Sequence, residues 1–206
     1  MIAVIDYGRG NLFSISQALS HLGAEHKIVT DTEAVAKADK IILPGVGAFG
    51  DGMEALEKSG LEPVIKHAAS DGTPILGICL GMQLMASSGL EFGEHRGLGL
   101  IEGTVKPLPE GNGEIDSVRI PNVGWRKLIR QNNHAFLDGL PDPVMTYFVH
   151  SYAFNTDDPD DIALTIAING TKITAGIHRD NLYGYQFHPE KSGIMGLELI
   201  ERFLNA

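Results

Sequence analysis

The chain has a single cysteine, Cys79, within the stretch Gly77-Ile78-Cys79-Leu80-Gly81. A short apolar run precedes this cysteine and an amphipathic run, Leu80 to Ala86, follows it, which predicts a strand, a sharp turn and a helix. The flanking glycines permit a strained turn, and a helix N-terminus favours a thiolate. The pattern predicts a nucleophile elbow at Cys79, although a buried structural cysteine is equally compatible with these five residues alone.

A histidine and a glutamate follow another predicted strand near the end of the chain, in Tyr185-Gln186-Phe187-His188-Pro189-Glu190. A thiol nucleophile needs a base that takes its proton and returns it to the leaving group, and the base needs a third group to orient it. Because the proline interrupts regular structure, the His188 and Glu190 side chains need not point to opposite faces. Read alone, this segment would be a surface loop with a solvated histidine. Together with Cys79, it indicates a Cys79–His188–Glu190 triad.

A glycine-rich turn, Pro44-Gly45-Val46-Gly47-Ala48-Phe49-Gly50, follows a third predicted strand. Such a turn at the carboxyl end of a parallel strand can direct backbone N–H groups at a developing oxyanion. The Lys-Ser/Thr pair of a phosphate-binding loop does not follow it, and a simple tight turn is the remaining alternative. A nucleophile, a base and oxyanion donors at three strand ends predict acyl transfer through a thioester.

These side chains require a framework, and the first half of the chain alternates short apolar strands with helical patterns. Strands are expected at Ile2–Ile5, His26–Val29, Lys40–Leu43 and Ile75–Ile78, and helices at Leu12–Leu22, Met53–Lys58 and Leu61–Ala69. Short, wholly apolar strands separated by helices are typical of a parallel sheet covered on both faces.

The second half of the chain is richer in strand patterns. Strands are expected at Gly99–Lys106, Val144–His150, Ala163–Ile168, Lys172–Ile177 and Leu182–Phe187, with a hairpin turn at Asn169-Gly170 and a final helix over Gly193–Leu204. The predicted fold is therefore α/β, with an open, mostly parallel central sheet flanked by helices and an added antiparallel portion. A length of 206 residues suits a single domain over residues 1–206.

Composition excludes several classes of function. With 16 Lys and Arg against 26 Asp and Glu, the net charge is −10, which argues against nucleic acid and against anionic membranes. A lone cysteine excludes an internal disulfide and a cysteine-based metal site and fits a reducing, cytoplasmic compartment. Gly8 and Gly10 resemble the start of a dinucleotide fingerprint, but Phe13 occupies the third glycine position. We therefore expect no signal peptide, no membrane span, no metal and no cofactor.

Three motifs resemble those of class I (triad) glutamine amidotransferases, which hydrolyse glutamine and pass ammonia to a synthase: Pro44–Gly47, Gly77–Gln83 and His188–Glu190. Three further stretches, Asp6–Asn11, Pro121–Trp125 and Tyr147–Tyr152, are similar to the glutaminase subunits of imidazole glycerol phosphate synthases. The resemblance covers nearly the whole chain and implies a flavodoxin-like fold.

The resemblance also implies roles for individual residues. Cys79 would be the nucleophile, His188 the base and acid, and Glu190 its orienting group. The oxyanion donors would be the N–H of Leu80 and an N–H of the turn at Val46 and Gly47. L-glutamine would be held by Gln83 and by the backbone of Ser151 and Tyr152. Pro121, Asn122 and Trp125 would face the partner, and Asn122 stands where the family often carries histidine.

The implied partner is a (β/α)₈-barrel cyclase subunit of imidazole glycerol phosphate synthase, which uses the ammonia in histidine biosynthesis. Three alternatives remain at this stage. The chain could serve another synthase, of the anthranilate or aminodeoxychorismate type. It could be a non-catalytic protein that only binds a partner, or an isolated hydrolase such as a peptidase. For Trp125, a position in the core is the alternative to the interface.

Overall fold

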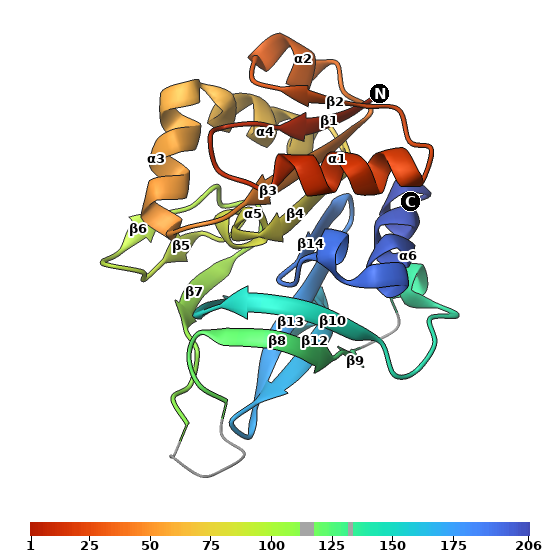
Figure 1. Ribbon diagram of the computed structural model, residues 1–206. Helices are drawn as coiled ribbons and strands as arrows, with labels where there is room; N and C mark the ends of the chain where they lie inside the picture. Colours follow the sequence, from red (N-terminus) through yellow and green to blue (C-terminus); the bar gives the residue numbers. More distant parts are fainter. Residues whose placement is uncertain (112–117, 132–133) are drawn as a thin grey trace.

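The computed structural model describes residues 1–111, 118–131 and 134–206, and its centre is an eight-stranded sheet (Figure 1). In spatial order the strands are β2 (His26–Val29), β1 (Ile2–Ile5), β3 (Lys40–Gly45), β4 (Ile75–Cys79), β14 (Leu182–Tyr185), β13 (Thr171–Arg179), β12 (Ile162–Ile168) and β9 (Ile129–Arg130). The first five pair in parallel and the remaining three antiparallel. The predicted fold class is confirmed, and the parallel part has the flavodoxin-like strand order.

Helices cover both faces of the parallel strands because these strands are apolar on both faces. One face packs against α1 (Leu12–His21) and α6 (Gly193–Leu204), and the other against α2 (Thr32–Ala36), α3 (Phe49–Ser59), α4 (Leu61–Ser70) and α5 (Leu80–Leu84). Strand alternation divides the core in two, so that Val4 and Ile42 lie toward α1 while Ala3 and Ile41 lie toward α3 and α4.

Two smaller sheets lie beside the central one, and they supply the other wall of the site. One pairs β8 (Asn122–Lys127) with β10 (Met145–His150); the other has the order β11 (Tyr152–Thr156), β7 (Gly103–Pro107), β5 (Ser88–Gly89) and β6 (His95–Arg96). Short 3₁₀ helices are η1 (Ala135–Leu137), η2 (Pro159–Asp161) and η3 (Pro189–Lys191). Only Ser151 separates β10 from β11, so the chain changes sheets at this residue.

Among the expected elements whose limits differ in the structure, one strand and one helix are shortened for the same reason. The strand expected at Gly99–Lys106 begins only at Gly103, and the helix expected to reach Ala86 ends at Leu84. The N–H groups of residues 98–101 donate to the carbonyl oxygens of residues 84–86, at the end of α5. Residues 98–101 therefore terminate the helix, and because their N–H groups are used in this way they do not form part of the strand.

No strand is predicted from the sequence at β8 or β11, but the hairpin is placed correctly. Pro121 and Gly124 weaken the strand pattern of β8, which among the described residues pairs only with β10. In the hairpin, Asn169 and Gly170 have φ angles of 49° and 75°, as a two-residue turn between β12 and β13 requires.

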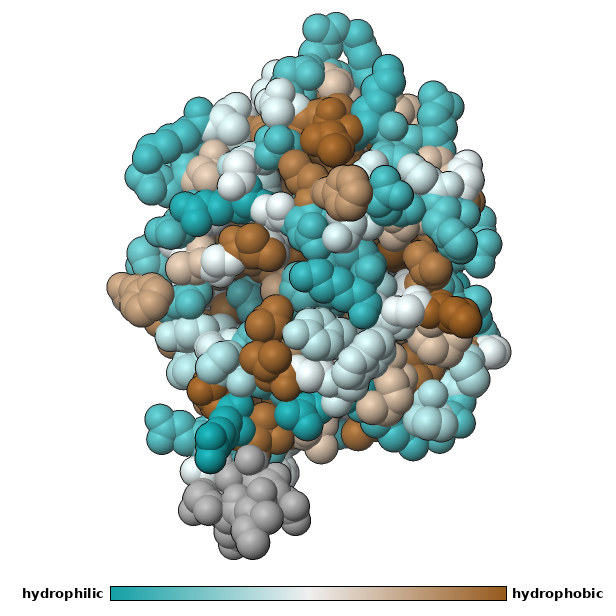
Figure 2. All heavy atoms as spheres, in the orientation of Figure 1, coloured by the Kyte–Doolittle hydropathy of each residue, from teal (hydrophilic) through white to brown (hydrophobic). Residues whose placement is uncertain are grey.

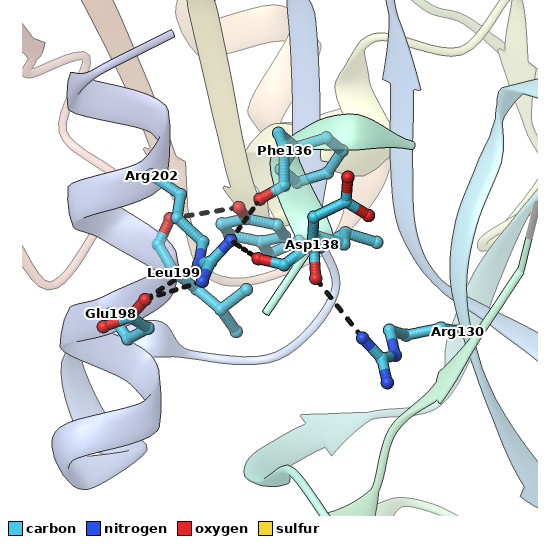
Figure 3. A network of polar contacts seen from close by, with 8 residues as sticks. Arg130, Phe136, Asp138, Glu198, Leu199 and Arg202 are labelled. Atoms are coloured by element: carbon cyan, nitrogen blue, oxygen red, sulfur yellow. Dashed lines mark hydrogen bonds and ion pairs between the residues drawn. The ribbon is translucent and has the colours of Figure 1, made fainter. Parts of the chain in front are cut away.

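The C-terminal helix is tied to the strand that precedes His188 (Figure 3). The Arg202 guanidinium donates to the carbonyl oxygens of Phe136 (2.9 Å) and Asp138 (2.7 Å) and pairs with Glu198. The Tyr185 hydroxyl, at the end of β14, donates to the Leu199 carbonyl at 3.1 Å. These contacts hold α6 against η1 and β14, and so they support the backbone that leads to His188.

Candidate active site

Cys79 is the last residue of β4, and α5 begins at the next residue. Its φ of 54° and ψ of −113° are strained for a residue with a side chain, as expected of a nucleophile elbow. The neighbouring glycines are sterically required. A Cβ on Gly77 would lie 2.7 Å from the Met82 nitrogen, and one on Gly81 would overlap the Leu43 carbonyl oxygen. The predicted strand, turn and helix are confirmed.

His188 follows β14, which lies beside β4 in parallel register, so both strand ends reach the same edge of the sheet. Glu190 Oε1 lies 2.9 Å from His188 Nδ1, and the Glu190 side chain has no exposed area. The carboxylate therefore places the proton of the neutral ring on Nδ1 and leaves Nε2 as the reactive nitrogen. Within the described part of the chain, Nε2 has no hydrogen-bond partner of good geometry.

The electrostatics of His188 favour the imidazolium. Burial lowers the pKa of this side chain, but its interactions with Cys79 and Glu190 outweigh burial and raise the pKa to about 10. The charged ring is therefore retained at neutral pH while it faces the thiol and the carboxylate.

One cavity of about 290 Å³ joins most of the predicted site residues. The side chains or backbone that line it belong to Val46, Gly47, Cys79, Leu80, Gln83, Glu91, Pro121, Val149, His150, Ser151, Tyr152 and His188. Glu190 lies behind His188, outside this lining. The volume suits a ligand of amino-acid size, and it lies at the carboxyl ends of parallel strands, where sites of open α/β sheets form.

The glycine-rich turn lies next to the elbow. Gly45 ends β3 in register with Cys79 on β4, and Gly47 has a φ of 107° that glycine tolerates readily. A Cβ on Gly45 would lie 2.5 Å from the Tyr7 hydroxyl oxygen and 2.8 Å from Leu80 Cβ. The turn thus packs directly on the first residue of α5, and the backbone of Val46, Gly47 and Leu80 meets at the cavity.

Gln83 reaches the cavity from α5 and is already committed to two acceptors. Its Nε2 donates to the Tyr152 carbonyl at 3.0 Å and to Gln186 Oε1 at 2.9 Å. Gln186, which the sequence analysis did not assign, donates from Nε2 to Cys79 Sγ at 3.8 Å. Its position two residues before His188, in the strand-end motif, is the signal that would have identified it.

Glu91 is a second residue that the sequence analysis missed. Its Oε2 accepts from the Phe49 N–H at 2.8 Å, at the start of α3, and its side chain lines the cavity. Of the described residues that line the cavity, Glu91 alone carries a carboxylate. It lies in an irregular loop, where an isolated glutamate gives no sequence signal, so only the tertiary structure brings it to the site.

The three residues predicted to face a partner differ in position. Trp125 is 50% exposed, which excludes the core position considered for it, and it packs edge-on against Tyr147 with ring centroids 6.1 Å apart. Pro121 is exposed and lines the cavity mouth. Asn122, in contrast, is 0% exposed, so the expectation that it faces a partner is corrected. Alternation along β8 turns Asn122 inward and Trp125 outward.

The described residues contain no group of three or more His, Cys, Asp or Glu side chains arranged to hold a metal ion. In the same residues, no helix combines the length and apolar character needed to span a membrane.

The family model and similar known sequences point to the same family. Residues 3–206 match the family model described as glutamine amidotransferase class-I. A Symbiobacterium thermophilum protein named imidazole glycerol phosphate synthase subunit HisH is 44% identical over 199 residues, covering 97% of this chain and 91% of its own length. A Streptococcus gordonii protein of the same name is 45% identical over 203 residues, with coverages of 98% and 95%.

Comparison with solved structures shows the same fold. The structure titled "Structure of PurLQS from Thermotoga maritima" has a TM-score of 0.75 at 23% identity, covering 99% of this chain and 97% of its own. Another, titled "Crystal structure of glutamine amidotransferase", has a TM-score of 0.75 at 18% identity, with coverages of 100% and 98%.

Proposed function

Because this chain belongs to the class-I glutamine amidotransferase family, we propose that it hydrolyses L-glutamine as the glutaminase subunit of an imidazole glycerol phosphate synthase. The observation that carries the chemistry is the convergence of Cys79 and His188 on one cavity, with Glu190 at 2.9 Å from His188 Nδ1. The high identity to subunits of that name over nearly the full chain supports this particular synthase.

In the first half of the reaction, the Cys79 thiolate attacks the side-chain amide carbon of glutamine. The carbonyl oxygen takes the negative charge, and the N–H groups of Leu80 and of the turn at Val46 and Gly47 stabilise it. His188 Nε2 gives its proton to the departing nitrogen as the C–N bond breaks. The products of this half are ammonia and a glutamyl thioester on Cys79.

In the second half, His188 is neutral and accepts a proton from water as the water oxygen attacks the thioester carbon. The C–S bond breaks, glutamate is released, and Cys79 returns to the thiolate paired with the imidazolium. Glu190 holds the ring in the same orientation in both halves, so that Nε2 faces the reacting atoms. This mechanism uses only side chains and backbone groups of the chain.

The cavity also suits the amino-acid end of glutamine. We assign the α-ammonium group to Glu91, whose Oε1 is not used by the Phe49 N–H. The carbonyl oxygens of Ser151 and Tyr152 already accept hydrogen bonds from Leu108 and from Gln83 and His150, respectively. The contribution of these two residues to glutamine binding is therefore assigned to their N–H groups.

An apolar surface beside the cavity suits a docked synthase. The outward apolar and aromatic side chains of β8 and β10, which we call the β8–β10 face, are exposed or half-buried: Val123, Trp125, Met145, Tyr147 and Val149. Figure 2 shows hydrophobic and intermediate side chains over these strands. Free ammonia would be protonated and lost at neutral pH, so a partner over the cavity mouth serves the reaction. The partner we propose is the (β/α)₈-barrel cyclase subunit.

The decisive experiment reconstitutes the chain with the barrel cyclase and measures both glutamine-dependent and ammonia-dependent synthesis. For Cys79→Ser we expect glutamine hydrolysis to fall by several orders of magnitude, because the nucleophile is lost. Partner binding and ammonia-dependent synthesis should be retained. Near-normal glutamine hydrolysis by this variant would refute the mechanism. Glutamine-dependent synthesis with an anthranilate-type synthase, and none with the cyclase, would refute the choice of partner.

A further inference from the structure

Beneath the β8–β10 face, an unbroken series of hydrogen bonds leads from Arg126, at the partly exposed end, toward the cavity. Arg126 Nε donates to Asn122 Oδ1 at 2.8 Å, and Asn122 Nδ2 contacts His150 Nε2 at 2.9 Å. His150 Nδ1 contacts the Tyr152 carbonyl oxygen at 2.8 Å. Asn122 and His150 are buried, so neither can replace these partners with bulk water.

The chemistry of Arg126 fixes the direction of every bond in this series. A guanidinium only donates, so the Asn122 oxygen must face it and the Asn122 amide N–H must face His150. His150 Nε2 must then accept, which places the ring proton on Nδ1. A carbonyl oxygen only accepts, and the Nδ1–H of His150 meets that requirement at Tyr152. Arg126, acting through Asn122, and the Tyr152 carbonyl therefore favour the same neutral tautomer of His150, although Arg126 makes no hydrogen bond with that ring.

A second series connects the same carbonyl to the sulfur. Gln83 Nε2 also donates to the Tyr152 oxygen, at 3.0 Å, and its other N–H donates to Gln186 Oε1 at 2.9 Å. The Gln186 oxygen is thereby occupied, and its amide N–H points at Cys79 Sγ, 3.8 Å away. Gln83 and Gln186 are both buried, so their amide orientations are set by these partners.

We propose that Arg126 and Asn122 are positioning residues for Cys79, acting through the tautomer of His150 and the Gln83–Gln186 pair. The Tyr152 carbonyl receives one N–H from His150 and one from Gln83. A change of the His150 tautomer would point the Nδ1 lone pair at this oxygen, and the repulsion would displace the carbonyl on which Gln83 is held. Gln83 then loses its fixed orientation, and with it the Gln186 N–H that stabilises the thiolate. This inference rests on the proposed function only in taking Cys79 as the nucleophile.

The electrostatics of His150 agree with this geometry. Burial lowers its pKa to about 4, the Tyr152 carbonyl opposes that shift, and the charges of Arg126 and His188 reinforce it. If the His150 ring were protonated, its Nε2–H would face the Asn122 N–H, and two donors would meet. Rotating the Asn122 amide would not help, because its N–H would then face the Arg126 N–H, which is also a donor. The neutral ring is thus stabilised by both its surroundings and its hydrogen bonds.

The test uses the full chain labelled with ¹⁵N in histidine, because ring nitrogen shifts report which nitrogen carries the proton. In the wild type we expect His150 to be neutral, with the proton on Nδ1. Arg126→Leu removes the donor and frees Asn122 to turn, so the His150 nitrogen signals should change. Arg126→Lys retains a donor and should restore the wild-type signals. Lys127→Leu, which removes the adjacent outward charge on β8, is the matched control and should leave them unchanged.

The second readout is the rate at which iodoacetamide labels Cys79, which requires no glutamine and no partner. Loss of the hydrogen bond to sulfur should slow labelling about three- to tenfold in Arg126→Leu, with wild-type rates in Arg126→Lys and Lys127→Leu. Asn122→Asp is an independent variant. Its carboxylate oxygen faces Nε2, so His150 should become protonated at neutral pH. Because the imidazolium keeps its Nδ1–H on the Tyr152 carbonyl, labelling should stay at the wild-type rate.

The outcomes separate this inference from the proposed function. A wild-type proton on Nε2 of His150, or a changed tautomer in Arg126→Leu with unchanged labelling, would overturn the positioning role. A changed tautomer with slowed labelling, corrected by Arg126→Lys, would establish it. If the wild type shows the expected tautomer and labelling but hydrolyses no glutamine with the cyclase, the proposed function fails and the positioning of Cys79 stands.

Discussion

Two histidines line the same cavity, and their surroundings shift their pKa values in opposite directions. His188 faces Cys79 and Glu190, whose interactions outweigh burial and raise its pKa to about 10. His150 is buried and faces Arg126 and His188, and its pKa falls to about 4. At neutral pH one ring carries a proton for transfer and the other is held neutral as a structural donor. Divergent shifts of this kind are how one site assigns separate roles to similar groups.

The raised pKa of His188 predicts an alkaline limit to the activity. The imidazolium is needed to protonate the leaving nitrogen, so kcat/KM should fall as pH rises through the pKa of His188. Because Glu190 raises this pKa, Glu190→Gln should move the alkaline limb to lower pH by about one unit or more. His188→Asn should be nearly as damaging as loss of Cys79. An alkaline limb that stays in place in Glu190→Gln would contradict the role given to the carboxylate.

The lowered pKa of His150 predicts acid sensitivity of the fold. Below about pH 6.5 the unfolded chain binds a proton at this residue that the folded chain does not, so stability falls as pH drops toward 4. The expected loss between pH 6.5 and pH 5 is about 2 kcal/mol. Urea unfolding at both pH values would measure it, with His150→Gln as the reference. Equal losses in the two proteins would show that His150 is not held neutral.

At the scale of elements, the backbone of α5 packs so closely on β3 and β4 at the elbow that only glycine fits at two positions. Gly77 and Gly81 bring the first turn of α5 against β3 and β4 so closely that neither position accommodates a Cβ. The helix is short because residues 98–101 terminate it. The backbone of Leu80 is therefore held at one position relative to Cys79 and the glycine-rich turn.

Two alanine substitutions distinguish the cost of a steric clash at the elbow from the cost of a positive φ angle alone. Gly81→Ala would drive a methyl group into the Leu43 carbonyl and should cost about 3 kcal/mol or more, with loss of activity. Gly60 has a φ of 70° and no atom near its missing Cβ, so Gly60→Ala should cost only about 1 to 2 kcal/mol. Denaturant unfolding and a glutaminase assay would compare them. A fully active, stable Gly81→Ala protein would show that the elbow can relax.

At the scale of the molecule, the site lies between two layers whose strands alternate along the sequence. The central sheet supplies Cys79 and His188, and the layer of β8, β10 and β11 supplies His150 and Tyr152. The β8–β10 face lies on the outer side of that second layer. A partner on this face would contact the strands whose inner side chains line the cavity.

We predict that the chain alone hydrolyses glutamine poorly and that the cyclase carrying its nucleotide substrate stimulates it. The turn at Pro44–Gly50 contains glycines that permit a peptide flip, so an oxyanion N–H can be misplaced until docking reshapes the turn. One misplaced donor costs about a hundredfold or more in rate. Glutamate release during titration with the partner, with and without nucleotide, would measure this. Equal rates for the free chain and the loaded complex would exclude gating by the turn.

A substitution at Trp125 tests, in the same titration, whether the partner binds the β8–β10 face. Its half-exposed ring lies at the centre of the β8–β10 face, and Trp125→Ala should weaken partner binding by about tenfold or more. Activity of the saturated complex should recover. The matched control is Phe13→Ala, which removes an exposed aromatic from α1. Equal affinities for Trp125→Ala and the wild type would remove this face from the proposed interface.

The sequence alone determined the features that depend on neighbouring residues. The run Gly77–Gly81 indicated the strand, turn and helix of the elbow. The apolar strands indicated the covered parallel sheet, and Asn169-Gly170 indicated a hairpin. Each of these is set by local sterics and by the periodicity of apolar side chains, which a single stretch of chain contains.

Only the tertiary structure decided which side chains meet. It brought Glu91 to the cavity, turned Asn122 inward onto His150, and placed Gln186 between Gln83 and Cys79. Such contacts depend on strand register and on the packing of one layer against another. No single stretch of sequence specifies them, because register and packing arise from the whole core at once.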